Sequence, residues 1–129
     1  MPHTQPDSNS IYLWPELPPQ SAPGDPFRPW LDFYPADIDQ PRGLMLVCPG
    51  GGYGGRAAHE GEPIARAFNQ MGLNAAVVLY RVSPNRHPAP LLDVARAVRI
   101  IRQNAQNWRV DPNRIGVCGF SAGGHLAAS

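Results

Sequence analysis

The chain has 129 residues, of which 43% are hydrophobic and 16% charged, so it can supply one hydrophobic core and is too apolar to be disordered throughout. Its net charge of +1 comes from 11 basic and 10 acidic residues, and the basic residues, all arginine, are scattered along the sequence. No field of one sign is available to attract nucleic acid or an anionic membrane, so we expect neither as a partner.

The first ten residues, MPHTQPDSNS, lack the apolar stretch of a secretory signal, which favours a cytoplasmic location. No apolar run approaches the roughly 20 residues that cross a bilayer. Cys48 and Cys118 lie in apolar runs, and neither has a cysteine or histidine nearby at metal-ligand spacing. We expect two buried, reduced thiols and no metal site.

Prolines are concentrated near the start of the chain, where eight of the 16 lie between Pro2 and Pro29. Proline disfavours helix, so residues 1–43 are predicted to form an extended arm. Residues 11–13 and 30–34 are predicted to add short edge strands to it.

Residues 44–129 are predicted to form the N-terminal part of a catalytic domain. The apolar run LMLVC at 44–48 is typical of a strand buried on both faces. Apolar positions predict a helix over 61–71, with Pro63 in its first turn and Gly72 at its end. A second apolar run at 74–80 predicts another strand. The apolar positions that predict the helix over 61–71 are Ile64, Ala65, Phe68 and Met71.

The following segment predicts one long helix over 90–108. Residues 111–113, Asp-Pro-Asn, predict a turn, residues 115–118 a strand, and Ala122 the start of another helix. Strands that alternate with helices imply parallel pairing in an α/β fold. The long helix has an apolar stripe made of Leu91, Val94, Ala95, Val98 and Ile101.

The segment Gly119-Phe120-Ser121-Ala122-Gly123 has the G-x-S-x-G pattern of a nucleophile elbow, between a predicted strand and a predicted helix. Such an elbow presents a serine hydroxyl on a sharp turn, and flanking glycines remove side chains that would collide there. The helix start adds free backbone donors beside the reacting oxygen. Ser121 is therefore the predicted nucleophile.

A glycine run, PGGGYGG, directly follows the strand at 44–48. In this fold the oxyanion hole combines the amide after the nucleophile, here Ala122, with amides from a loop that follows another strand. We assign the loop amides to Gly51 and Gly52, and we expect Tyr53 to line the acyl pocket.

The same run also satisfies the dinucleotide pattern G-x-G-x-x-G through Gly50, Gly52 and Gly55. That site needs an acidic residue at the end of the next strand, where this chain has Leu79-Tyr80-Arg81. A dinucleotide site would also leave the serine motif unexplained, so we expect no cofactor.

Four runs together resemble the acetyl esterase/lipase and acetylxylan-esterase-like branch (carboxylesterases) of the α/β-hydrolases: CPGGGYGG, HEGEPIARAFNQMGLNAAVVLYRV, HPAPLLDVARAVRIIR and DPNRIGVCGFSAGGHLAAS. The resemblance covers roughly residues 44–129. It implies the N-terminal half of an α/β-hydrolase fold, a mostly parallel sheet with helices on both faces. It also implies that the glycine-loop strand lies beside the nucleophile strand, with Cys48 close to Cys118.

The remaining triad members are expected after the nucleophile, in the order Ser, Asp or Glu, His. The eight residues after Ser121 contain no carboxylate, and His125 would lie on the same helix as the nucleophile, pointing away from it. A triad built from earlier residues would be permuted, and we interpret these residues as structural: His59, His87, Asp93 and Asp111. The sequence is therefore expected to be a fragment.

The expected activity is hydrolysis of short-acyl carboxylic esters of a small-molecule or carbohydrate alcohol, with acetylated sugars or xylan suggested by the resemblance. Two alternatives remain open: a non-catalytic binding protein with this fold, and amidase or peptidase chemistry on the same scaffold.

Overall fold

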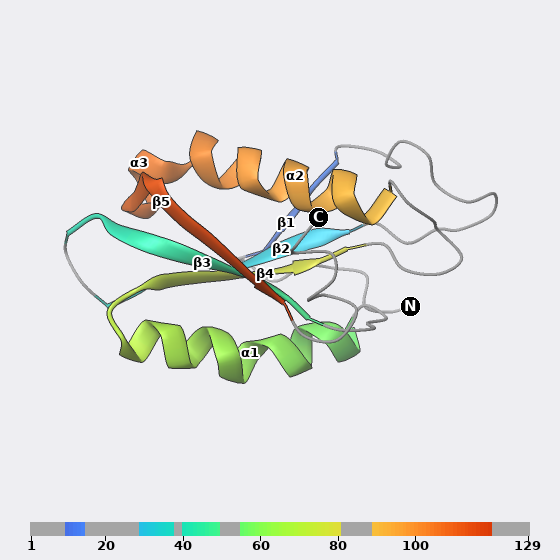
Figure 1. Cartoon of the computed structure of the whole chain (residues 1–129), viewed down its shortest axis with the longest axis horizontal. Coiled ribbons are helices and arrows are strands. Elements are labelled where there is room, and N and C mark those ends of the chain that lie inside the picture. Colours follow the sequence, from blue (N-terminus) through green and yellow to red (C-terminus); the bar gives the residue numbers. More distant parts are fainter. Residues whose placement is uncertain (1–9, 15–28, 38–39, 50–54, 81–88, 120–129) are drawn as a thin grey trace.

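The computed structural model describes residues 10–14, 29–37, 40–49, 55–80 and 89–119, with side chains described from residue 61 in the first helix and from residue 91 in the second. These residues include a five-stranded sheet with the strand order β1-β2-β4-β3-β5 (Figure 1). β1 (Ser10–Tyr12) pairs antiparallel with β2 (Trp30–Tyr34), and β2 pairs antiparallel with β4 (Asn74–Leu79). Both strands expected in the N-terminal arm are thus present, but only β1 is an edge strand, because β2 is paired on both sides.

The other three strands form the parallel part of the sheet. β3 (Arg42–Cys48) lies between β4 and β5 (Val110–Gly119) and runs parallel to both. The apolar runs of β3 and β4 follow from burial on two faces, because helices that return the chain between parallel strands cover the sheet on both sides. This confirms the expected parallel pairing. In β5 only Val110 is buried, so the expectation of a buried strand around Cys118 was wrong.

The helices cover the two faces of the sheet. α1 (Gly55–Gln70) lies on one face, and α2 (Ala89–Gln103) with α3 (Ala105–Trp108) lies on the other (Figure 1). Side chains alternate between these faces along each strand. In β4, for example, Val78 belongs to the core cluster under α2, and Val77 to the cluster under α1.

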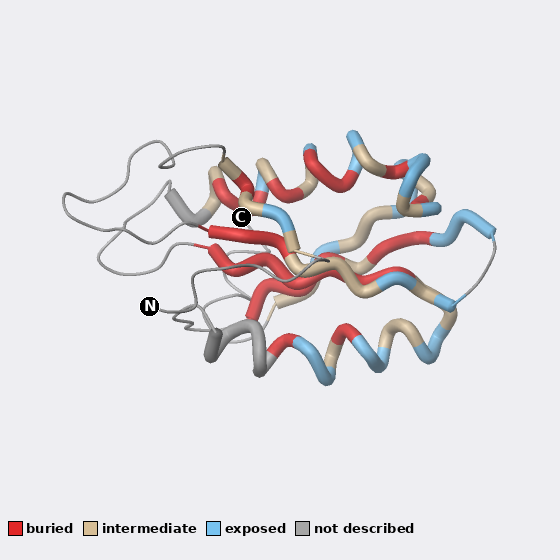
Figure 2. The backbone as a smooth tube through the Cα atoms, turned by 180° about the vertical axis from the view of Figure 1, so that it is seen from behind, coloured by how far each residue is buried: buried red, intermediate tan, exposed pale blue. Residues whose placement is uncertain are grey.

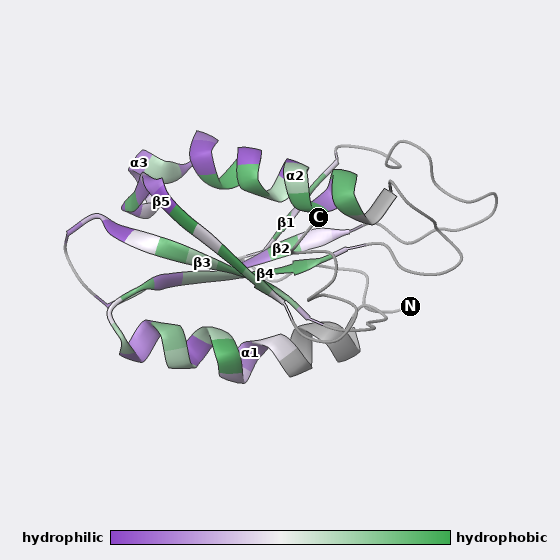
Figure 3. Ribbon diagram, in the orientation of Figure 1, coloured by the Kyte–Doolittle hydropathy of each residue, from purple (hydrophilic) through white to green (hydrophobic). Residues whose placement is uncertain are grey.

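Burial is concentrated in the strands and in the inward faces of the helices, whereas the outer helix faces are exposed (Figure 2). The hydropathy of the ribbon follows the same division, with apolar residues in the central strands (Figure 3). Within the described residues, no helix has the length and apolar character needed to cross a membrane.

The helix predicted over 61–71 is longer than expected and begins at Gly55. Pro63 therefore lies inside the helix and not in its first turn. Met71 is 69% exposed, so its assignment to the buried face was wrong. Gly72 has a φ of 84°, which confirms it as the residue that ends the helix. The predicted helix began at Gly61, because glycine weakens helices. In the structure Gly61 lies inside α1 and packs against the sheet.

The segment predicted as one helix over 90–108 is divided into two. α2 ends at Gln103, Asn104 intervenes, and α3 ends before Arg109, which has a left-handed φ of 56°. The buried side of α2 also differs from the predicted stripe, because Ala95 is exposed whereas Ala97 and Ile100 are buried.

The predicted turn at 111–113 lies inside β5. Arg42 pairs with Val110 and Leu44 with Ile115, so two steps along β3 match five along β5, and three residues are extra. The Asp111 Oδ1 atom accepts a hydrogen bond from the Asn113 amide at 3.0 Å, a local bond typical of Asx turns. The turn chemistry is therefore present as an irregularity within the strand.

Candidate active site

The two sequence motifs begin at neighbouring strand ends. β3 and β5 are adjacent and parallel, and their last paired residues are Cys48 and Gly119. The glycine run begins directly after Pro49, and Ser121 stands two residues after Gly119. The predicted adjacency of the glycine-loop strand and the nucleophile strand is thus confirmed. The predicted site residues themselves lie outside the described residues: Gly51, Gly52, Tyr53, Ser121 and Ala122.

A third strand end contributes a tyrosine to this edge of the sheet. Tyr80 follows β4 and is 7% exposed, and its Oη atom donates a hydrogen bond of 2.5 Å to the carbonyl oxygen of buried Pro49. Burial, with a smaller contribution from neighbouring Cys48, raises the pKa of Tyr80 to about 12. The hydroxyl therefore remains a protonated donor at neutral pH. The sequence analysis did not identify Tyr80, although its position just after an apolar run was a signal.

The two thiols lie next to this edge but on opposite faces of the sheet. Cys48 belongs to the core cluster under α2, whereas Cys118 packs against the cluster under α1. Both are free, as expected, but the expectation that both are buried was wrong for Cys118, which is only partly buried. Burial raises the pKa of Cys48 to about 12 and also raises the pKa of Cys118. Both thiols are therefore protonated at neutral pH and are poor nucleophiles.

Asp93 is fully buried in α2, at 0% exposure, and accepts a hydrogen bond of 2.9 Å from Trp14 Nε1. Arg96, one turn later, donates from Nε to the Leu13 carbonyl oxygen at 2.7 Å and stacks over the Trp14 ring. This agrees with the interpretation of Asp93 as structural, but the sequence did not indicate Trp14 as its partner. Asp93 and Arg96 thus bind residues 13–14 of the N-terminal arm to α2.

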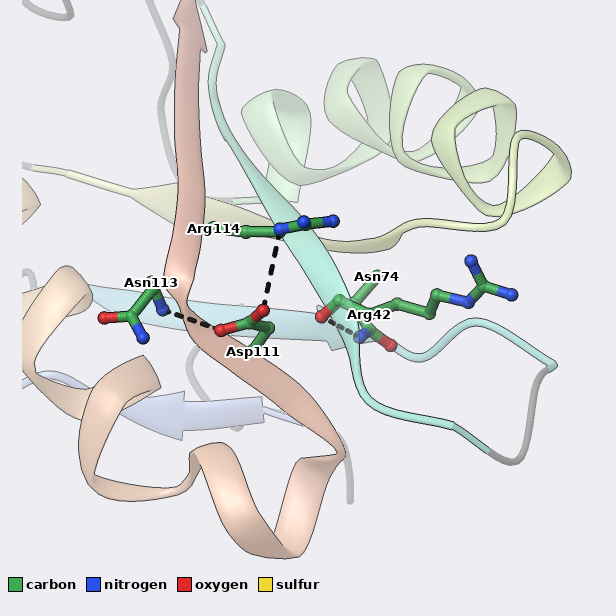
Figure 4. Close-up of polar contacts among 5 residues, drawn as sticks. All are labelled: Arg42, Asn74, Asp111, Asn113 and Arg114. Carbon is green, nitrogen blue, oxygen red and sulfur yellow. Dashed lines mark hydrogen bonds and ion pairs between the residues drawn. The ribbon is translucent and has the colours of Figure 1, made fainter.

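A polar cluster around Asn74 and Asp111 lies where β4 and β5 begin, at the other end of these strands from the two sequence motifs (Figure 4). Asp111 forms an ion pair of 3.6 Å with exposed Arg114, whereas the Arg42 side chain extends away from it. Arg42, Asp111 and Arg114 border a surface cavity of about 230 Å³ at the beginning of β3. Asp111 therefore lies at the other end of β5 from Gly119, which agrees with its interpretation as a turn residue.

No histidine side chain is described near the strand ends at Cys48 and Gly119. His59 lies in α1 without a described side chain, and His87 and His125 lie outside the described residues. Within the described ranges, no three His, Cys, Asp or Glu side chains are grouped to hold a metal ion.

A family model matches the chain over residues 31–129, which include the two strand ends and both motifs. The chain belongs to the BD-FAE family. Residues 31–129 of this BD-FAE chain span β2 to β5, so the family match covers most of the sheet described above.

Relatives of this BD-FAE chain include proteins named as esterases. It is 43% identical over 107 residues to an endo-1,4-beta-xylanase B of Butyrivibrio fibrisolvens, covering 80% of this chain and 17% of the relative. It is 39% identical over 92 residues to an acetylxylan esterase of Xylanibacter ruminicola, covering 70% of this chain and 19% of that protein.

The solved structure of an acetyl ester-xyloside bifunctional hydrolase from Caldicellulosiruptor lactoaceticus superimposes with a TM-score of 0.84 at 47% identity. The match covers 95% of this chain and 46% of that one. The fold is accordingly that of an α/β-hydrolase, as expected. The chain spans less than half the length of each of these three proteins.

Proposed function

We propose that the whole protein is a serine carboxylesterase that hydrolyses short-acyl esters, with acetylated sugars or xylan as the substrate class. The observation that carries the proposal is the pairing of Cys48 with Gly119. Because these residues end neighbouring parallel strands, the glycine run and the serine motif begin at adjacent strand ends. The similarity to an acetylxylan esterase and to an acetyl ester-xyloside hydrolase supports the choice of acetyl esters.

In the proposed mechanism, the Ser121 Oγ atom attacks the ester carbonyl carbon while a histidine takes the hydroxyl proton. The amides of Gly51, Gly52 and Ala122 stabilise the tetrahedral oxyanion. The C–O bond to the alcohol then breaks, and the alcohol leaves with the proton from the histidine. Water attacks the acyl-enzyme in the same way and releases the carboxylic acid. Tyr53 is assigned to the acyl pocket.

The histidine and its carboxylate partner are assigned to sequence that follows Ser129 in the whole protein. The triad order of this fold places both after the nucleophile, and the residues from Ala122 to Ser129 contain no carboxylate. The 129 residues by themselves are therefore proposed to show little turnover. No step of this mechanism requires a metal ion or an organic cofactor.

The decisive experiment compares the whole protein with its Ser121→Ala variant on p-nitrophenyl acetate. We expect kcat/KM to fall by at least about 10³-fold, because loss of the nucleophile removes the acyl-enzyme route. Ser10→Ala is the matched control. Ser10 lies on β1, the strand farthest from β5, and its hydroxyl donates to Asp32 on β2, so kcat/KM should be unchanged.

Labelling separates esterase chemistry from the alternatives. A fluorophosphonate probe should modify Ser121, as mapped by mass spectrometry, and p-nitroacetanilide should be cleaved far more slowly than the acetate ester. Acetate release from acetylated xylan, together with no release of p-nitrophenol from p-nitrophenyl dodecanoate, would support the substrate class. Full activity of Ser121→Ala, or no labelling of Ser121, would overturn the proposal.

A further inference from the structure

The Pro49 carbonyl group needs a partner outside the β-ladder. The paired residues of β3 and β5 end at Cys48 and Gly119, so Pro49 lies just past the last registered pair. Pro49 is buried, and a buried carbonyl oxygen without a hydrogen bond is unfavourable. The bond from Tyr80 Oη, at 2.5 Å, satisfies this oxygen.

Tyr80 is held by the most buried part of the sheet. All six residues of β4, which it follows, are buried, and β4 is registered against β3 through Val77 and Val47. The Tyr80 side chain belongs to the same core cluster as Cys48 and Val78. The position of its hydroxyl is therefore fixed by the centre of the sheet.

The bond constrains the chain where it enters the glycine run. A peptide unit is planar, so a fixed carbonyl oxygen fixes the plane of the whole unit between Pro49 and the next residue. The proline ring also restricts φ at Pro49. Two constraints thus act on the last described residue before residues 50–54.

We propose that Tyr80 is a positioning residue for oxyanion stabilisation, acting through its hydrogen bond to the Pro49 carbonyl group. The inference rests on the proposed function, because it requires the glycine run to supply the oxyanion donors. The role is one of positioning, because the Tyr80 hydroxyl is bonded to the Pro49 carbonyl oxygen. Misaligned donors weaken binding of the transition state more than binding of the substrate, since the oxyanion develops only during the reaction.

The test is Tyr80→Phe in the whole protein, which removes the hydroxyl and keeps the ring. We expect kcat on p-nitrophenyl acetate to fall by about 10- to 100-fold, below the roughly 10²–10³-fold effect of losing an oxyanion donor outright. KM should stay within about twofold, because ground-state binding is unchanged. Active-site titration with a fluorophosphonate counts the competent molecules and removes any effect of partial unfolding.

The matched control is Tyr34→Phe, because Tyr34 pairs with Ala75 at the opposite end of β4. Its kcat should equal that of the wild type. A second readout is inhibition by phenylboronic acid, which forms a tetrahedral anion on a serine. Its inhibition constant should rise in Tyr80→Phe by the same factor as kcat/KM falls, and a purely structural role would not link the two.

Two failures are distinguishable. If the wild-type protein hydrolyses the ester through Ser121 but Tyr80→Phe matches Tyr34→Phe in kcat and in boronic acid inhibition, the role of Tyr80 is refuted. If Tyr80→Phe loses kcat as expected but the inhibition constant of phenylboronic acid does not change, the role of Tyr80 is also refuted. If the wild type neither hydrolyses esters nor labels at Ser121, the proposed function itself has failed.

Discussion

The side chain of Asn74 joins three parts of the backbone to the start of β4. Its Oδ1 atom accepts from the Ala36 amide at 2.9 Å, and its Nδ2 atom donates to the carbonyl oxygens of Arg42 at 3.3 Å and Arg109 at 3.1 Å. Asn74 is 3% exposed, so each bond replaces hydration that burial has removed. One amide thus aligns the beginnings of β3, β4 and β5, at the edge opposite the candidate active site.

The buried thiol of Cys48 makes stability depend on pH in the alkaline range. Burial raises its pKa from 9.0 to about 12. Between these values the unfolded chain has lost the proton and the folded chain retains it, so stability falls as pH rises. The slope for one such group is at most about 1.4 kcal/mol per pH unit.

Urea unfolding of the wild type and of Cys48→Ala between about pH 6 and pH 11 checks this prediction. The wild type should lose stability more steeply above pH 9, whereas the two slopes should coincide below pH 8. Cys118→Ala is the matched control, with a smaller change in slope, because Cys118 is only half-buried. Equal slopes for wild type and Cys48→Ala above pH 9 would contradict the assigned cause.

Among the elements, α1 packs directly against Val77 of β4 at Gly61. A Cβ atom at this position would lie 2.6 Å from Val77 Cγ1, which is closer than packing allows. In an exposed helix, glycine to alanine stabilises by up to about 1 kcal/mol. Here we expect Gly61→Ala to destabilise by about 1–3 kcal/mol, because the helix must move away from β4.

A double-mutant cycle with Val77→Ala tests the cause. In that background the obstructing methyl groups are absent, so Gly61→Ala should become neutral or stabilising in urea unfolding. The same destabilisation in both backgrounds would show that contact with Val77 is not responsible.

β3 and β4 were predictable from sequence because their apolar runs are complete and local, whereas β5 begins at Val110, well before the predicted start at residue 115. The run at 74–80 needed no knowledge of its partners, and β4 indeed spans Asn74–Leu79. Helix limits and helix faces were less accessible, since they depend on which neighbours are present. Ala95 and Ala97 are equivalent in the sequence, and only packing on the sheet decides that Ala97 is the buried one.

The same distinction applies to the candidate active site. The motifs around Gly51 and Ser121 are local patterns, and the adjacency of the strands that precede them was implied by the resemblance to the acetyl esterase branch of the α/β-hydrolases. The bonds of Tyr80 to Pro49 and of Trp14 to Asp93 join residues 31 and 79 positions apart. No spacing rule predicts such pairs, because they depend on where strand ends and helix faces meet in three dimensions.

At the scale of the whole molecule, the proposed division of labour can be measured. The 129-residue polypeptide should hydrolyse p-nitrophenyl acetate at least about 10³-fold more slowly than the whole protein, because it would lack a base to activate Ser121. A circular dichroism spectrum with helix and strand signals is the control for folding. Turnover at the rate of the whole protein, abolished by Ser121→Ala, would place the triad within these 129 residues.

The sheet order also has a consequence for synthesis on the ribosome. β3 is the central strand of the parallel part, yet both of its partners, β4 and β5, come later in the chain. The run LMLVC therefore emerges before any strand that can pair with it, and its second edge stays open until Gly119 has been made. A nascent chain with such an exposed apolar strand is prone to aggregation, so slow translation between β3 and β5 should increase its demand for chaperones.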